Sequence, residues 1–275
     1  MDLRVRSIDE SLAFYRDVVG LEVAERSIES AALRSPGGAE LLRLNSAGVT
    51  ERAEKRATGL FHVAIRFPTR SALGDVLARL VAAGIEIGAG DHGVSEALYI
   101  DDPDGNGVEL YWDRPEDQWP APSEDMLVPM VTLPVDLQGV LDEGRGNDAV
   151  GRLAEAGTDV GHVHLQVSDV ESTVRFYADE VGLDLVARMG GQAAFFSSNG
   201  YHHHIGANAW NSRGSGPATP SHAGLSRVVF GVDDVEQLER LRLRLEEHGH
   251  RVSGAENESV MVSDPDGNEL VFSTV

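Results

Sequence analysis

Apolar and polar positions along the chain follow two periods, and the change from one to the other predicts its elements. The segment from Gly59 to Ile65 is short and mostly apolar, which is typical of a buried strand. Over residues 71–83 the apolar positions take helical spacing, and Gly84 then ends the predicted helix. The apolar side chains that define this helical face are Leu73, Val76, Leu77 and Leu80.

The same strand and helix pair recurs along the chain. An apolar strand at 161–167 is followed by a predicted helix at 170–180, and a strand at 224–230 by a helix at 235–248. A segment rich in Pro, Asp, Glu and Gly, 114–160, is predicted to be a linker. Four modules, each a strand, a helix and further strands, are therefore expected at 1–50, 59–113, 161–210 and 224–275.

Two longer matches relate these modules in pairs. The segment 14–26 resembles 176–188, and the Asp-Pro-Asp-Gly-Asn turn at 102–106 recurs at 264–268, in both cases 162 residues later. An interval this long indicates a duplicated domain rather than a solenoid. We predict one domain at 1–113 and a second at 161–275. The turn is interpreted as structural because Pro fixes φ and Gly supplies a positive φ.

Composition narrows the class of protein and the chemistry open to it. The 275 residues are enough for one large domain or two ordinary ones, and 41% hydrophobic with 25% charged residues is typical of a globular protein. There is no cysteine, so a metal would be held by His and carboxylate. A net charge of −22 argues against nucleic acid or an anionic membrane as partner. With no apolar run of membrane-spanning length, a cytoplasmic protein is expected, and a homo-oligomer stays open.

The repeated strand and helix pattern resembles the vicinal oxygen chelate superfamily, which includes glyoxalases, bleomycin-resistance proteins and extradiol dioxygenases. This resemblance implies an α+β fold of four βαβββ modules that form two domains with cupped mixed sheets. In such proteins a pair of modules encloses a metal, and the ligands come from the first and last strands of a module.

Only the second and third modules carry side chains of the right kind at those positions. His62 and Glu109 lie on the first and last predicted strands of module two, and His162 lies on the first strand of module three. In module one the position equivalent to His162 falls before Met1, and the last strand offers no good ligand. Module four has Arg227 and Val271 at the equivalent positions. Two His and one carboxylate leave coordination positions open, which suits non-haem Fe(II).

The segment 90–109 is similar to the signature of extradiol ring-cleavage dioxygenases, and the chain as a whole most resembles two-domain bacterial catechol 2,3-dioxygenases. The resemblance implies that Glu109 is the carboxylate ligand and that His92 and Tyr99 face the substrate. The segment 195–206 looks like the one that carries the acid–base His, which would be His203. His162 and His164 share a strand face, and the family match favours His162.

We predict that modules two and three pair to form the active cup, and that modules one and four form a degenerate companion. In the larger extradiol enzymes the module with the first His precedes the module with the second His and the Glu, and in this chain that order is reversed. On the predicted last strand of module three, alternation places His203 on the face opposite His202 and His204. The expected function is an extradiol dioxygenase that uses Fe(II), or Mn(II) as a substitute, with O₂ and a small catechol-type diol. The alternatives are a glyoxalase-type lyase or isomerase and a metal-free drug-binding protein.

Overall fold

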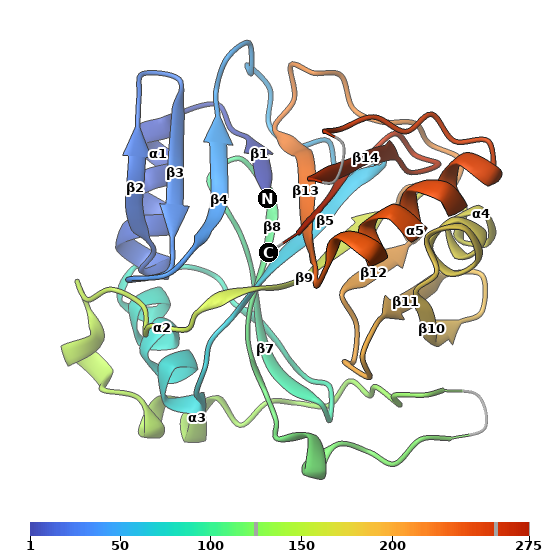
Figure 1. Cartoon of the computed structure of the whole chain (residues 1–275). Helices are drawn as coiled ribbons and strands as arrows, with labels where there is room; N and C mark the ends of the chain where they lie inside the picture. The colour runs from blue at the N-terminus through green and yellow to red at the C-terminus, as the bar shows by residue number, and fades with distance from the viewer. Residues whose placement is uncertain (124–125, 256–257, 275) are drawn as a thin grey trace.

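Two curled mixed sheets form the frame of the protein in a computed structural model that describes residues 1–123, 126–255 and 258–274 (Figure 1). The seven-stranded sheet has the order β14-β15-β13-β1-β4-β3-β2, and the eight-stranded sheet the order β10-β11-β12-β9-β5-β8-β7-β6. The strands of the first sheet are β1 (Asp2–Arg4), β2 (Glu22–Arg26), β3 (Ser30–Arg34), β4 (Glu40–Asn45), β13 (Gly224–Val232), β14 (Ser259–Ser263) and β15 (Glu269–Thr274). Those of the second are β5 (Gly59–Arg66), β6 (Gly88–Asp91), β7 (Ser95–Asp101), β8 (Gly107–Asp113), β9 (Asp159–Gln166), β10 (Asp184–Met189), β11 (Ala193–Ser197) and β12 (Ile205–Asn208).

The helices pack on the sheets from outside. Helix α2 contacts β8, α4 contacts β11 and β12, and α5 lies across β13, β14 and β15 (Figure 1). The α-helices are α1 (Ile8–Phe14), α2 (Arg70–Ala82), α3 (Leu137–Glu143), α4 (Val170–Val174) and α5 (Val235–Glu247). Two π-helical turns, η1 (Tyr15–Val19) and η4 (Arg175–Val181), continue α1 and α4. Two 3₁₀ turns are η2 (Glu116–Gln118) and η3 (Gly146–Ala149). The predicted α+β architecture is confirmed.

Each sheet takes one module from each half of the chain. The eight-stranded sheet joins modules two and three through the antiparallel pair β5 and β9, and the seven-stranded sheet joins modules one and four through β1 and β13. The predicted pairing of modules is therefore confirmed. The division of the chain into domains at 1–113 and 161–275 stays a prediction.

Local sequence accounts for the helix bounds. The Thr69 side chain caps α2 by accepting a hydrogen bond from the Ala72 backbone N–H, and the helix ends just before Gly84, whose φ is 67°. The Asp234 side chain caps α5 in the same way. Both helices lie within one residue of their predicted bounds. The helix predicted at 170–180 is α4 followed by η4.

The Asp-Pro-Asp-Gly-Asn turns are structural, as predicted. Asp102 Oδ1 accepts hydrogen bonds from the backbone N–H groups of Asp104 and Asn106, both at 2.9 Å. Its Oδ2 accepts one from the buried hydroxyl of Tyr15 at 3.0 Å. Tyr177 makes the same 3.0 Å bond to Asp264 in the second turn. In each half, therefore, the helical segment of one module holds the turn of the next module.

The segment predicted as a linker packs closely on module two. A Cβ added at Gly74 of α2 would lie 2.3 Å from the Val140 carbonyl oxygen of α3, so the two helices approach through glycine. Asp75 accepts a 2.7 Å hydrogen bond from the backbone N–H of Arg145. The part of this segment that forms α3 and η3 is thus held against α2.

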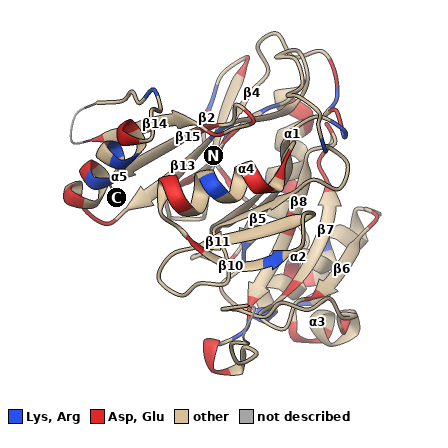
Figure 2. Cartoon of the chain, turned by 90° about the vertical axis from the view of Figure 1, so that its right-hand side faces the viewer, with Lys and Arg blue, Asp and Glu red and all other residues tan. Residues whose placement is uncertain are grey.

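Two further features concern module four and the surface. In its described residues, module four has β13, α5, β14 and β15, with a single bridge between Ser253 and Met261 beside them. Among the described residues we find no helical segment whose length and hydropathy would allow it to span a bilayer. Figure 2 shows acidic segments on α4, α5 and several loops, so the negative charge is spread over several elements on this side of the molecule.

Candidate metal centre

Three neighbouring strands bring His62, Glu109 and His162 together. In the register of the eight-stranded sheet, Ala64 of β5 lies between Glu109 of β8 and His162 of β9. His62 lies two residues before Ala64 on the same strand, so its side chain projects from the same face. The small side chain of Ala64 leaves the space above the sheet to the three polar groups.

The three side chains converge on one point. One nitrogen of each imidazole and one oxygen of Glu109 all lie within 4.8 Å of one another, and the three residues are buried. Glu109 Oε2 is 2.8 Å from His62 Nε2 and 3.1 Å from His162 Nε2. It is the only such cluster of His, Cys, Asp or Glu found in the part of the chain that the structure describes.

Burial and mutual charge set the protonation of the cluster. Burial alone would raise the pKa of the Glu109 carboxyl, but His162 and His62 outweigh it and hold that pKa well below its usual range. Burial lowers the pKa of His162 to about 4. At neutral pH the site therefore presents a carboxylate and a neutral His162 imidazole, which is the protonation state that a metal ligand needs.

The donor atoms fit a divalent cation. His62 Nε2 is buried and has no hydrogen-bond partner of suitable geometry among the described residues, although the Glu109 oxygen is nearby. An unpartnered buried nitrogen is costly unless something else binds it. Two imidazole nitrogens and one carboxylate oxygen suit Fe(II) or Mn(II), and the absence of cysteine excludes thiolate ligation.

Tyr99 and His92 lie beside this cluster. Tyr99 of β7 is paired in register with Glu109, and its hydroxyl is 2.7 Å from His92 Nε2. His92 Nδ1 is 2.8 Å from the Val131 carbonyl oxygen, which can only accept. Nδ1 therefore carries the His92 proton, and Tyr99 donates its O–H to the bare Nε2. Burial, with Glu109 beside it, raises the pKa of Tyr99 well above its usual range, so the phenol stays protonated.

His203 reaches the cluster from the third module. Its ring is buried, and its centroid lies 4.1 Å from that of His162. The predicted orientation is wrong, because residues 202–204 precede β12 and do not alternate as a strand would. His202 Nδ1 and His203 Nδ1 are in fact within 2.8 Å of each other.

Sequence reasoning missed the polar residues behind His203. Asp113 Oδ1 accepts a 2.8 Å hydrogen bond from His202 Nε2, and Asp113 Oδ2 accepts one of 2.8 Å from the Tyr201 hydroxyl. Tyr111 and Tyr201 are joined by their hydroxyls at 2.8 Å. A signal was available, because alternation along β8 places Tyr111 and Asp113 on the same face as Glu109.

Aromatic side chains and a cavity also flank the cluster. The His164 ring lies 4.9 Å from that of His62 and 5.1 Å from that of Phe61. Space for it depends on Gly206, where an added Cβ would lie 2.8 Å from His164 Nδ1. His62 and Tyr99 line a cavity of about 220 Å³, to which Phe61 and Asn211 also contribute. This cavity adjoins the cluster through His62 and has room for a small molecule.

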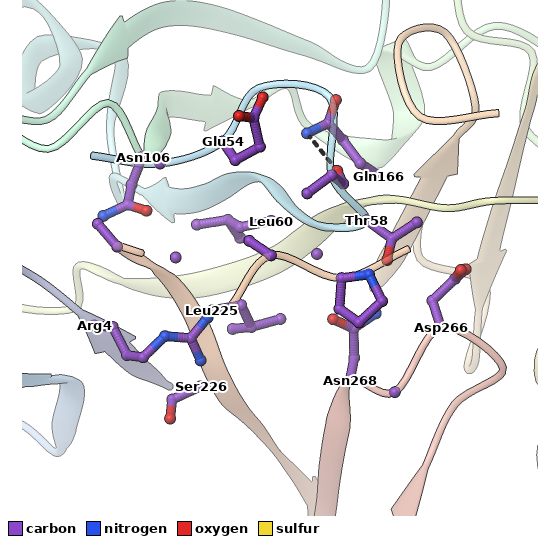
Figure 3. A pocket seen from close by; sticks show the side chains of 18 of the residues that line it. Arg4, Glu54, Thr58, Leu60, Asn106, Gln166, Leu225, Ser226, Asp266 and Asn268 are labelled. Carbon is purple, nitrogen blue, oxygen red and sulfur yellow. Dashed lines mark hydrogen bonds between the residues drawn. The ribbon is translucent and has the colours of Figure 1, made fainter. Parts of the chain in front are cut away.

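A second cavity, of about 200 Å³, lies apart from the three clustered side chains, none of which lines it (Figure 3). Its walls include Arg4 and Gln166, which are 162 residues apart and so equivalent in the two halves, and also Asn106 and Asn268, equivalent in the same way. Thr58 Oγ1 and Asn106 Oδ1 are buried there without a protein partner among the described residues. The cavity is polar and large enough to admit water.

Comparison with known proteins relates this arrangement to one superfamily. The model of the Glyoxalase/Bleomycin resistance protein/Dioxygenase superfamily matches residues 1–110 and 159–272. The chain is 41% identical, over 96% of its length and 92% of the relative's, to a catechol-2,3-dioxygenase of Bacillus subtilis (strain 168).

Two solved structures support the fold. A protein from Bacillus subtilis subsp. subtilis str. 168 that is named as a candidate dioxygenase superposes with a TM-score of 0.64 at 13% identity, covering 100% of this chain and 83% of its own. A mutant of glyoxalase I from Zea mays superposes with a TM-score of 0.55 at 17% identity, covering 99% and 91%. At these identities the likeness concerns the fold alone.

The family model confirms the predicted resemblance to the superfamily, and the 41% match confirms the resemblance to catechol 2,3-dioxygenases within it. Two repeated modules meet in one sheet, and a cluster of two His and one Glu lies on its face. The chain belongs to the Glyoxalase/Bleomycin resistance protein/Dioxygenase superfamily.

Proposed function

We propose that the protein is an extradiol ring-cleavage dioxygenase that acts on a small catechol-type diol with O₂ and Fe(II), with Mn(II) as a possible substitute. The observation that carries the proposal is the convergence of His62, Glu109 and His162 within 4.8 Å on a buried sheet face. The 41% identity to a catechol-2,3-dioxygenase, over nearly the whole of both chains, supports it. His62, Glu109 and His162 hold the metal in this proposal.

The ion supplies the redox chemistry that lets O₂ react with an aromatic diol. The protein contributes a balancing charge and excludes water from the ligands. Glu109 would give one negative charge to the ion, and the three ligand side chains are buried and so shielded from bulk water.

Proton handling falls to three other side chains. His203 lies against His162 and takes or returns a substrate proton, since it is the imidazole nearest to the ligands that is not itself in the cluster. Tyr99, held by His92, hydrogen-bonds a substrate oxygen from the cavity that His62 and Tyr99 line. Binding in that cavity places the diol next to the ligands.

The test is anaerobic reconstitution with Fe(II), followed by addition of catechol and air. A yellow ring-cleavage product with matching O₂ uptake is expected. Glu109→Gln keeps the size of the side chain and removes its charge, and we expect turnover to fall at least about 100-fold because metal affinity is lost. Metal content and O₂ uptake are measured on the same samples.

Glu269→Gln is the matched control. Glu269 pairs with Arg227 in the degenerate cup, so its loss should leave metal content and turnover unchanged. Tight binding of Fe(II) or Mn(II) without O₂ uptake would favour a glyoxalase-type lyase or isomerase. Binding of an aromatic drug without any metal would favour a drug-binding protein.

A further inference from the structure

A chain of hydrogen bonds runs from Asp113, at the end of β8, to the His203 imidazole next to the cluster. Asp113 Oδ1 is 2.8 Å from His202 Nε2, and His202 Nδ1 is 2.8 Å from His203 Nδ1. His202 is almost fully buried, and His203 is 7% exposed. Two adjacent His side chains in the same turn therefore share one bond, with a carboxylate at its far end.

The chemistry of the partners sets the direction of these bonds. The carboxylate of Asp113 can only accept, so His202 donates from Nε2. In a neutral imidazole the other nitrogen is then bare, so His202 Nδ1 accepts from His203 Nδ1–H. His203 Nε2 is left without a proton, and it has no hydrogen-bond partner among the described residues.

Asp113 is held in its ionised form by several donors at once. Its Oδ2 accepts from the Tyr201 hydroxyl at 2.8 Å and from Arg66 Nη1 at 3.2 Å. Burial raises the pKa of the Asp113 carboxyl, but the bonds from His202, Tyr201 and Arg66 outweigh burial, and the pKa lies below its usual value. A carboxylate with this many donors is well suited to orienting an imidazole.

We propose that Asp113 and His202 are positioning residues that keep the proton of His203 on Nδ1 and leave Nε2 free to take a proton from a substrate hydroxyl. The inference rests on the proposed function, in which His203 transfers that proton. In this step the proton moves from the diol oxygen to Nε2, and the oxygen keeps the electron pair. The His202 ring packs edge to face on His162, with centroids 5.9 Å apart, and in this scheme it acts on the substrate only through His203.

Asp113→Asn tests the proposal in the full-length, Fe(II)-loaded protein. The amide has the size of the carboxylate but no charge, and it can present an N–H that turns the His202 bond around. We expect kcat to fall at least about tenfold, since general acid–base catalysis contributes factors of 10² to 10⁴, while KM and metal content change little. Asp159→Asn is the matched control, because Asp159 binds the same Arg66, at 2.6 Å, without touching a His.

A second measurement does not depend on turnover. In Zn(II)-loaded protein labelled with ¹⁵N-histidine, the ring nitrogens of His203 should show a proton on Nδ1 and a bare Nε2 in the wild type and in Asp159→Asn. Asp113→Asn should shift His203 toward the other tautomer.

The outcomes separate the two proposals. A wild-type protein with the expected His203 tautomer but no ring cleavage contradicts the proposed function alone. A proton on Nε2 of His203 in the wild type overturns the positioning role, as does an active Asp113→Asn variant with unchanged kcat. The wild-type spectrum decides the matter even where Asp113→Asn does not fold.

Discussion

Glu109 occupies an unusual position for a single side chain, because two imidazole nitrogens approach the same one of its oxygens at 2.8 and 3.1 Å. In the metal-free protein this carboxylate offsets the burial of the His162 ring through a hydrogen bond, and it lies close to His62 Nε2 without a hydrogen bond of suitable geometry. The neutral state of His162, whose pKa burial lowers to about 4, is the other part of that balance. The cluster is therefore stable near neutral pH and unstable in acid.

This gives a pH prediction for the metal-free protein. The folded-state pKa of His162 lies below its unfolded value, so the unfolded state binds more protons and stability falls as pH drops from about 6.5 towards 4. Between pH 7 and pH 5 we expect His162 to account for a loss of about 2 kcal/mol in the free energy of unfolding. Urea unfolding at the two pH values measures it.

His162→Gln removes the titrating ring. Between pH 7 and pH 5 the free energy of unfolding of this variant should therefore fall by about 2 kcal/mol less than that of the wild type. His248→Gln serves as control, because His248 is exposed at the end of α5. An equal pH dependence in His162→Gln and the wild type would show that His162 does not titrate between the folded and unfolded states.

At the scale of elements, the helical segment of one module holds the turn of its neighbour. Tyr15 bonds to the turn that leads into β8, the strand that carries Glu109. Tyr177 makes the equivalent bond to the turn that leads into β15, which carries Val271 at the matching position. The two bonds are alike in length and burial, but only one of them supports a ligand strand.

Tyr15→Phe and Tyr177→Phe should therefore lower the free energy of unfolding by a similar amount, about 1–2 kcal/mol each, since each leaves a buried carboxylate with one donor fewer. Only Tyr15→Phe should also weaken metal binding, because its turn sets the position of Glu109. Denaturant unfolding and metal titration on the two variants measure both effects. A loss of metal affinity in Tyr177→Phe as large as in Tyr15→Phe would contradict this account.

In the whole molecule, modules from the two halves of the chain combine to form each sheet. Each sheet takes one module from each half, so His62 and Glu109 come from the first half while His162 and His203 come from the second. The segment around α3 packs with the first half, since α3 lies against α2 and Leu133 bridges to Asp91, whereas the Leu127 backbone N–H donates to Val186 of β10 in the second half. Neither half alone contains the complete cluster.

We predict that fragments 1–158 and 159–275 bind metal weakly when made separately and recover tight binding when they are made together. The physical reason is that β5 and β9 pair only when both fragments are present, and this pair brings His162 to Glu109. Metal content after co-purification measures the recovery. Fragment 1–158 with the metal affinity of the whole chain would show that His162 is not needed as a ligand.

The repeated unit, and the parts of the site that belong to it, could be predicted from the order of residues alone. The helical period predicted α2 to within a residue, and the 162-residue interval identified the turns and the modules that lack ligands. His62 and Glu109 could be proposed because each lies on a strand of the same module. These features depend on local spacing, which is written directly in the chain.

How these parts meet depends on strand register and long-range packing in the folded chain. The register of β5 and β9 sets Ala64, rather than His62, opposite His162, and so brings His162 close to Glu109 while His164 lies beside His62. The orientation of His203 was predicted wrongly because its segment is not a strand. Asp113, which hydrogen-bonds its neighbour His202, lies 89 residues away from that residue along the chain. Register and contacts between distant segments come from packing of the whole chain, and no local period encodes them.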